Sequence, residues 1–178
     1  TVAYTACDQE LVVPSSGRVT SDLVQGVTLS LDSIKPGYTS LSANVLVRNA
    51  SSQYLNTLSS KGAPIRLSWR FIRVTELGGH LDNPGFTKRK NLLWSLAPNT
   101  EAQTSVQAEL PTKPGDYLFE VTLVQDGVAW FHHLGMKVAS FPITIKNERS
   151  SAPISSYQAE NIQLEIKNAQ LNKGSIFV

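Results

Sequence analysis

The chain has 178 residues, of which 41% are hydrophobic and 17% are charged, and its formal net charge is +2. This apolar content is too high for a disordered chain, and the length suits one domain that buries its own core. The small net charge, with no stripe of Lys or Arg interleaved with aromatics, argues against a nucleic-acid partner. A polar but weakly charged surface is common in all-β binding modules.

Cysteine usage and hydropathy exclude two further classes of protein. Cys7 is the only cysteine, so an intramolecular disulfide and a Cys-rich zinc site are both excluded. No apolar run approaches the roughly 20 residues that a membrane-spanning helix needs, and we expect no direct membrane insertion. The chain begins at Thr1 without an initiator Met, which fits a mature secreted protein or a piece of a longer one.

Alternation of apolar and polar residues with a period of two predicts strands along most of the chain. In chain order we expect strands over residues 26–31, 40–48, 64–71, 91–96, 104–110, 117–125 and 136–145. The second strand shows the pattern most clearly, with an apolar face of Leu41, Ala43, Val45 and Val47. Residues 77–87 contain two glycine or proline clusters and predict a loop.

Two of these strands carry two aromatic residues each. The strand over 64–71 places Ile65, Leu67, Trp69 and Phe71 on an inner face, and Arg66, Ser68 and Arg70 on the opposite face. The strand over 117–125 is followed by Asp126-Gly127, a pair typical of a type I′ hairpin turn. The return begins with Trp130 and Phe131, which on a strand face opposite sides, so one enters the core and the other is exposed or covered.

The composition changes after residue 145. The serine-rich segment 146–158 is a linker by composition. Beyond it, Ile162, Leu164 and Ile166 alternate with polar residues and predict a detached C-terminal strand. This strand can fold back onto its own sheet or be exchanged between subunits, and we expect a homodimer formed through it. We therefore divide the chain into a β-sandwich domain, 1–145, and a linker plus C-terminal strand, 146–178.

About seven short strands with turn signals every ~8–12 residues predict an all-β fold, an immunoglobulin-like antiparallel β-sandwich without a disulfide and with a detached C-terminal strand. In such a fold Trp69 corresponds to the buried tryptophan of the third strand. Tyr117, which follows Pro114-Gly115, corresponds to the tyrosine corner.

Three stretches of the sequence resemble a known family. They are Pro64-Ile-Arg-Leu-Ser-Trp-Arg-Phe71, then Leu92-Leu-Trp-Ser-Leu-Ala-Pro98 with Pro114-Gly-Asp-Tyr117, and finally Leu123-Val-Gln-Asp-Gly-Val-Ala-Trp-Phe131 with Gly135. Over about residues 27–145 the chain is similar to an Ig-like accessory domain of bacterial surface-polysaccharide assembly proteins, related to the C-terminal domain of Wzt-type O-antigen ABC transporter subunits. The chain departs from such exporters because it has no Gly-x-x-x-x-Gly-Lys-Ser/Thr nucleotide-binding loop.

The resemblance implies a non-catalytic module that recognises a bacterial surface polysaccharide of O-antigen type for export or assembly. It also implies a dimer with an exchanged terminal strand. The implied location is cytoplasmic, at the membrane through a larger transporter or assembly protein, with the cell envelope or secretion as the alternative. The alternative function is a structural or protein-interaction Ig-like domain of an adhesin or of a glycan-modifying enzyme.

Sugar binding needs an aromatic face for the ring and planar polar groups for its hydroxyls. The candidate ligand-binding residues are therefore aromatic, basic or hydrogen-bonding: Trp130, Trp94, Arg66, Arg70, Ser68 and His132. Arginine suits an anionic or hydroxyl-rich ligand. Core packing is the alternative for either tryptophan, and a solvated sheet face is the alternative for the arginine row.

We expect no catalytic centre, metal site or cofactor. His132 and His133 are adjacent, so on a strand they face opposite sides, whereas zinc needs three or four converging ligands. No Gly-x-Ser-x-Gly nucleophile motif is present, and the acidic residues are scattered along the chain. Two of these acids could converge in the fold as a glycosidase pair, so a small glycan-active enzyme stays open as a third hypothesis. The formal glycosylation sequon Asn49-Ala50-Ser51 is interpreted as an ordinary turn.

Overall fold

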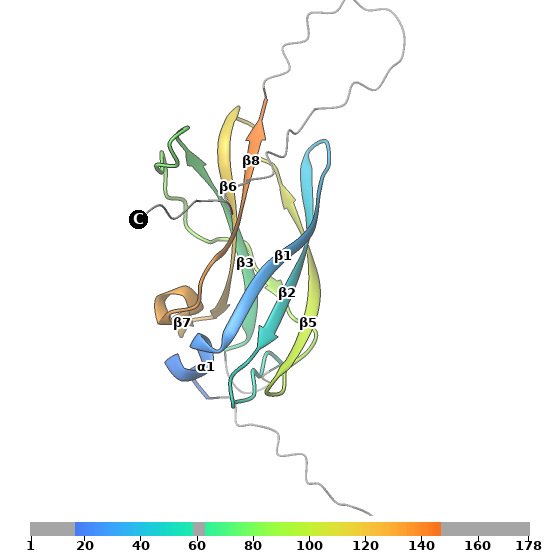
Figure 1. The fold of residues 1–178 in the computed structure, drawn as a ribbon, viewed down its shortest axis with the longest axis vertical. Helices are drawn as coiled ribbons and strands as arrows, with labels where there is room; N and C mark the ends of the chain where they lie inside the picture. Colours follow the sequence, from blue (N-terminus) through green and yellow to red (C-terminus); the bar gives the residue numbers. More distant parts are fainter. Residues whose placement is uncertain (1–16, 59–62, 147–178) are drawn as a thin grey trace, which may run out of the picture.

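The computed structural model describes residues 17–58 and 63–146, which form two antiparallel sheets packed face to face (Figure 1). The first sheet has the order β1-β2-β5, with bounds Val27–Pro36, Ser40–Asn49 and Thr100–Glu109. The second sheet has the order β4-β3-β6-β7, and β8 also pairs with β6. Its strands, in chain order, are β3 (Ile65–Val74), β4 (Lys90–Asn91), β6 (Gly115–Gln125), β7 (Ala129–Trp130) and β8 (Ala139–Ile145). The predicted all-β, disulfide-free immunoglobulin-like sandwich is confirmed.

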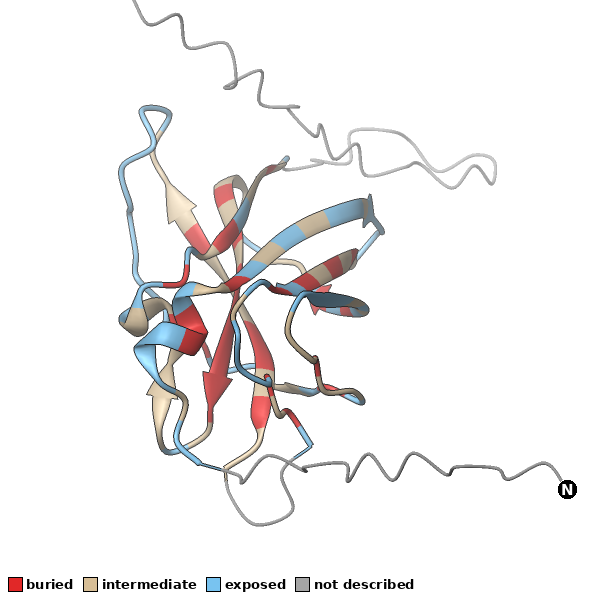
Figure 2. Cartoon of the chain, turned by 60° about the horizontal axis from the view of Figure 1, so that its bottom comes forward, coloured by how far each residue is buried: buried red, intermediate tan, exposed pale blue. Residues whose placement is uncertain are grey.

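The core lies between the two sheets, where the buried residues of Figure 2 face one another. The predicted inner face of β2 is buried throughout, since Leu41, Ala43, Val45 and Val47 are at most 2% exposed. Opposite them β6 buries Phe119, Val121 and Leu123 completely. Each such side chain contributes about 1.5–3 kcal/mol to stability by leaving water. A short helix, α1 (Ser21–Gln25), closes one end with Leu23 and Val24.

Tyr117 forms the predicted tyrosine corner. Its hydroxyl donates a hydrogen bond to the carbonyl oxygen of Lys113 at 2.8 Å, four residues upstream. The side chain is otherwise buried, and burial raises the pKa of the phenol. Trp69 is only half-buried, although it does pack against the core cluster as predicted.

Three local predictions need correction. Residues 91–96 do not form a strand: only Lys90–Asn91 pairs with β3, and Leu96 makes a single bridge to Leu55. The turn after β6 is not type I′, because Gly127 has φ of 67° but Asp126 does not have the positive φ that type I′ also requires. The first strand continues past residue 31 to Pro36, through a bulge between Asp32 and Lys35.

Several predictions concern residues that lie outside those described. These residues are Cys7, the predicted linker 146–158 apart from Lys146, and the predicted C-terminal strand over 161–167. The domain division and the exchanged strand therefore stay predictions. Within the described ranges, no helix is both long enough and apolar enough to cross a membrane.

Candidate functional site

Strand register places most of the predicted site residues on the outer face of the second sheet. Arg66 of β3 pairs with Val124 of β6, which in turn pairs with Trp130 of β7. Residues that pair across strands share a sheet face, so Arg66 and Trp130 lie in one row on the side away from the core. The rows that follow on this face pair Ser68 with Thr122 and Arg70 with Glu120.

A loop covers this face. The segment between β3 and β4 crosses the sheet and inserts Phe86, which is only 7% exposed. The ring of Phe86 lies 5.5 Å from that of Trp130 and 5.3 Å from that of His132, measured between centroids. We call Arg66, Phe86, Arg89, Trp130 and His132 the outer-face cluster.

Arg89 anchors the loop to the sheet. Its Nη1 donates to the carbonyl oxygen of Phe86 at 2.7 Å and to Ser68 Oγ at 2.8 Å. Its Nε lies 3.2 Å from Asp126 Oδ1 in a salt bridge. The guanidinium carbon is 4.6 Å from the centroid of Trp130, so the cation covers part of one indole face.

The predicted open row of donors is corrected at two positions. Ser68 is fully buried, and its hydroxyl donates to the carbonyl oxygen of Lys88 at 2.6 Å. Arg70 Nε donates to Glu120 Oε2 at 2.8 Å, and its Nη1 donates to Asn83 Oδ1 and to the carbonyl oxygen of Pro84. Both side chains hold the loop in place rather than presenting donors to solvent.

Arg66 differs from Arg70 because it keeps unused donor capacity. Its Nη1 lies 3.0 Å from Asp126 Oδ2, and the side chain is 35% exposed. Its Nε is buried and has no hydrogen-bond partner within the described part of the chain. Asp126 already accepts from Arg89 with its other oxygen, so two guanidiniums share one carboxylate. Arg66 is therefore the cation of the cluster whose guanidinium is least used by acceptors within the described part of the chain.

His132 lies in a short 3-10 helix, η1 (Phe131–Leu134), rather than on a strand. Its Nδ1 is 3.1 Å from Thr122 Oγ1, and its ring contacts His133 edge-on with centroids 4.4 Å apart. Burial lowers the pKa of His132, and the charges of His133 and Arg70 lower it further. Among residues 17–58 and 63–146, no three His, Cys, Asp or Glu side chains are grouped to hold a metal ion.

The structure separates the adjacent aromatics Trp130 and Phe131. Phe131 is fully buried in the core, whereas Trp130 is half-buried in the outer-face cluster. Trp94 does not belong to this cluster. Its indole nitrogen donates to the carbonyl oxygen of Gln103 at 3.3 Å, and the ring packs against the core beside β5. Sequence reasoning missed Phe86, since a loop prediction says nothing about which face a loop covers. Arg89 stands out in the sequence only as part of the basic run Lys88-Arg89-Lys90, which is interpreted as a loop charge cluster with a ligand-facing role as the alternative.

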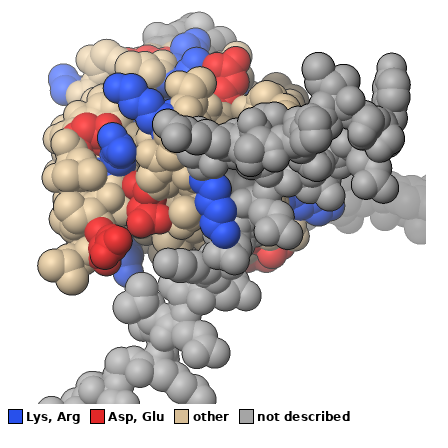
Figure 3. Space-filling model, turned by 90° about the horizontal axis from the view of Figure 1, so that it is seen from above, with Lys and Arg blue, Asp and Glu red and all other residues tan. Residues whose placement is uncertain are grey.

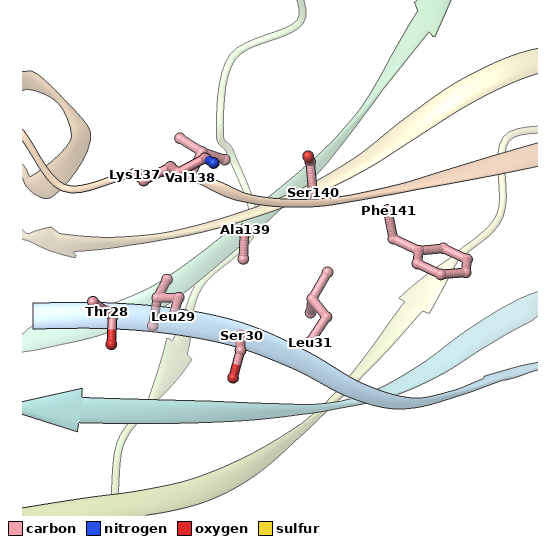
Figure 4. Close-up of a pocket in the computed structure, with 9 residues that line it drawn as sticks. All are labelled: Thr28, Leu29, Ser30, Leu31, Lys137, Val138, Ala139, Ser140 and Phe141. Atoms are coloured by element: carbon pink, nitrogen blue, oxygen red, sulfur yellow. The ribbon is translucent and has the colours of Figure 1, made fainter. Parts of the chain in front are cut away.

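A groove of about 570 Å³ lies elsewhere, between β1 and β8. It is lined by residues 28–31 and 137–141. Figure 4 shows Leu29 and Leu31 pointing across it toward Ala139 and Phe141. Seen from the top of the sandwich, basic and acidic side chains are interspersed and do not separate by sign (Figure 3).

Comparisons with known proteins do not assign the chain to a family. No protein-family model matches the chain, and no curated protein matches it. Among solved structures, an NMR structure of a CARDB domain from Pyrococcus furiosus is similar to it at 16% identity, covering 66% of this chain and 91% of that one, with a TM-score of 0.37. A likeness at this level does not bear on ligands or partners. The chain is thus an immunoglobulin-like β-sandwich whose function must be inferred from its own geometry.

Proposed function

We propose that the domain is a non-catalytic carbohydrate-binding module and that the outer-face cluster is its binding face. The observation that carries this proposal is the row that holds half-buried Trp130 on β7 and, across Val124 of β6, the partly exposed Arg66 on β3, whose Nε has no hydrogen-bond partner in the described part of the chain. An aromatic face and a planar guanidinium in one row of a sheet face suit a pyranose with hydroxyl or acidic substituents. His132, whose lowered pKa favours the neutral ring, adds a hydrogen-bonding group at the edge of the same cluster.

The proposed ligand is a bacterial surface polysaccharide of O-antigen type, bound during export or assembly. The sequence resemblance to Wzt-type accessory domains supports this choice of ligand. It also supports a cytoplasmic location at the membrane, reached through a larger transporter or assembly protein. A cell-envelope or secreted location is the alternative.

Binding without turnover is part of the proposal. The cluster borders two carboxylates, Glu120 and Asp126, and each is held by arginine. Glu120 faces Arg70, and Asp126 bridges Arg66 and Arg89. These ion pairs give both carboxylates a structural role, so neither has to be explained as a glycosidase acid or nucleophile.

The test is an array of bacterial polysaccharides followed by calorimetric titration of the best ligand. Arg66→Met should weaken binding about tenfold or more, the loss expected for one charge-assisted hydrogen bond. Arg48→Met is the matched control, because Arg48 is an exposed arginine on the other sheet. Silence across the array, or equal weakening by both variants, would contradict the proposal.

One observation favours the alternative, a protein-interaction domain. Leu77 is fully exposed and Leu81 is 58% exposed, and both lie in the loop that follows β3. Large apolar side chains that stay exposed can mark a protein contact. This alternative predicts no glycan affinity on the same array. It also predicts that the chain associates with itself in analytical ultracentrifugation and that a Leu77→Ser variant does so less.

A further inference from the structure

We propose that the groove between β1 and β8 is the docking site for residues 161–167 of the same chain, which add to the sandwich there as a strand. This inference is independent of the glycan-binding proposal, since the groove shares no residue with the outer-face cluster. It starts from the edges of the two sheets.

The outer edges of β1 and β8 are open in the described part of the chain. No strand within residues 17–58 and 63–146 pairs with either edge. The opposite edge of the first sheet, formed by β5, is covered by side chains. Lys90 Nζ donates to the carbonyl oxygen of Ser105, and Trp94 Nε1 donates to that of Gln103. Such side-chain cover is one way proteins protect an edge strand. The β1 and β8 edges lack it where they border the groove.

The open stretch is short and apolar. On β1 it ends at the bulge between Asp32 and Lys35, where Ser33 has φ of 49°, and on β8 it ends at Pro142, which cannot donate to a ladder. Between these limits Leu29, Leu31 and Phe141 point into the groove and are only half-buried. A guest strand with one apolar face would remove this surface from water.

The C-terminal sequence supplies such a face. Ile162, Leu164 and Ile166 alternate with Gln163, Glu165 and Lys167. One side of a strand here would be aliphatic and the other polar, which suits a half-buried edge position. Lys137 is the one charged residue among those that line the groove, and Glu165 offers it the opposite charge.

The direction of β1 and β8 and the length of the connector both allow residues 161–167 to reach the groove. Residue numbers along β1 and β8 increase in the same direction across the groove (Figure 4). A strand that returns after β8 therefore runs antiparallel to both edges, as in a hairpin. Residues 146–160 can span roughly 50 Å when extended, whereas the return past residues 142–145 needs only about 13 Å.

The same length favours docking within one chain over exchange between two. Strand exchange is promoted by short, strained hinges, and a connector over residues 146–160 is not short. A connector of this length holds the segment near its own groove at an effective concentration on the order of millimolar. A second copy of the chain would have to exceed that concentration to compete.

The first test is hydrogen exchange by mass spectrometry on the full-length chain. Leu164→Asp should raise amide exchange about tenfold or more along residues 27–31, 137–141, or both. The matched control is Gln163→Asp, which adds the same charge to the polar side of the segment and should leave exchange unchanged. Equal exchange in wild type and in both variants would overturn the proposal.

The second test is disulfide trapping in a Cys7→Ser background. Gln163→Cys paired with Ser30→Cys, or with Ser140→Cys, should give an oxidised monomer with an intramolecular bond. Gln107→Cys, an exposed position on β5, is the control partner and should remain unlinked. Covalent dimers would overturn docking in the same chain and assign the groove to a second copy. Failure of both pairs to link would also overturn the proposal.

Discussion

Phe131 and Trp130 are adjacent in sequence, and the structure assigns them opposite roles that mutagenesis can separate. Phe131 is 0% exposed and belongs to the core cluster. Truncation of a buried phenylalanine to alanine costs about 3–5 kcal/mol, through lost burial and the cavity left behind. Since domains of this size have a total stability of about 5–15 kcal/mol, Phe131→Ala should leave the domain close to unfolding.

Trp130→Ala should cost much less. The indole is half-buried, and its contacts are the rings of Phe86 and His132 and the guanidinium of Arg89. Aromatic pairs contribute about 0.5–1.5 kcal/mol and an exposed cation–π contact about 0.5–1 kcal/mol. Because the remaining rings can close part of the gap, we expect a net loss of about 1–2 kcal/mol.

Urea unfolding followed by circular dichroism measures both values. The free energy of unfolding is extrapolated to water, and an unchanged dependence on urea shows that both variants still unfold from a folded state. A loss of stability in Trp130→Ala equal to or larger than that in Phe131→Ala would refute the reasoning. Trp130 would then be a core residue and would not be available as a ligand platform.

Three further predictions concern stability. Tyr117→Phe should cost about 1 kcal/mol in the free energy of unfolding by removing one hydrogen bond. Burial raises the pKa of the Tyr117 phenol in the folded state above its ordinary value of 10.0. Wild type should therefore lose stability as pH rises above 10.0 through this group, and the variant should lack that contribution. Burial lowers the pKa of His132 in the folded state below its ordinary value of 6.5, so the unfolded chain takes up this proton more readily. The free energy of unfolding should therefore fall as pH drops below 6.5 in wild type and in a His80→Asn control. His132→Asn should lack this contribution. Asn49→Ala should cost about 2 kcal/mol or more in the free energy of unfolding, because the fully buried Asn49 amide donates to three backbone carbonyls. Ser51→Ala is the control and should cost little. A thermal scan that ranks the two variants equally would count against this role of Asn49.

Much of the fold follows from local alternation in the sequence. The alternating apolar residues that the sequence predicts for one face of residues 40–48 and of residues 117–125 are buried in β2 and β6. Tyr117 follows a Pro-Gly turn, and its corner hydrogen bond spans only four residues. The sequon at Asn49 is also explained by the fold, since its amide nitrogen is already used inside the protein. These features depend on residues close together in the chain.

The outer-face cluster depends on contacts between distant residues. Arg89 reaches Ser68 across 21 positions and Asp126 across 37, and no periodic pattern encodes such contacts. The predicted loop over residues 77–87 is confirmed, but the burial of Phe86 against the sheet depends on contacts with residues far away in the chain. The position of Trp94, outside the outer-face cluster, depends on distant contacts in the same way. Its neighbours Leu92 and Leu96 are both buried, and the segment packs irregularly instead of continuing as a strand.

The most direct test of the glycan-binding proposal is an NMR titration with the best ligand from the polysaccharide array. Three indole N–H signals are available, those of Trp69, Trp94 and Trp130. We predict that the Trp130 indole and the Arg66 Nε–H signals shift with saturation, while the Trp69 and Trp94 indoles stay in place. Saturable shifts confined to Trp94 or Trp69, or no shift at any of the three, would contradict the assignment of the outer-face cluster as the binding face.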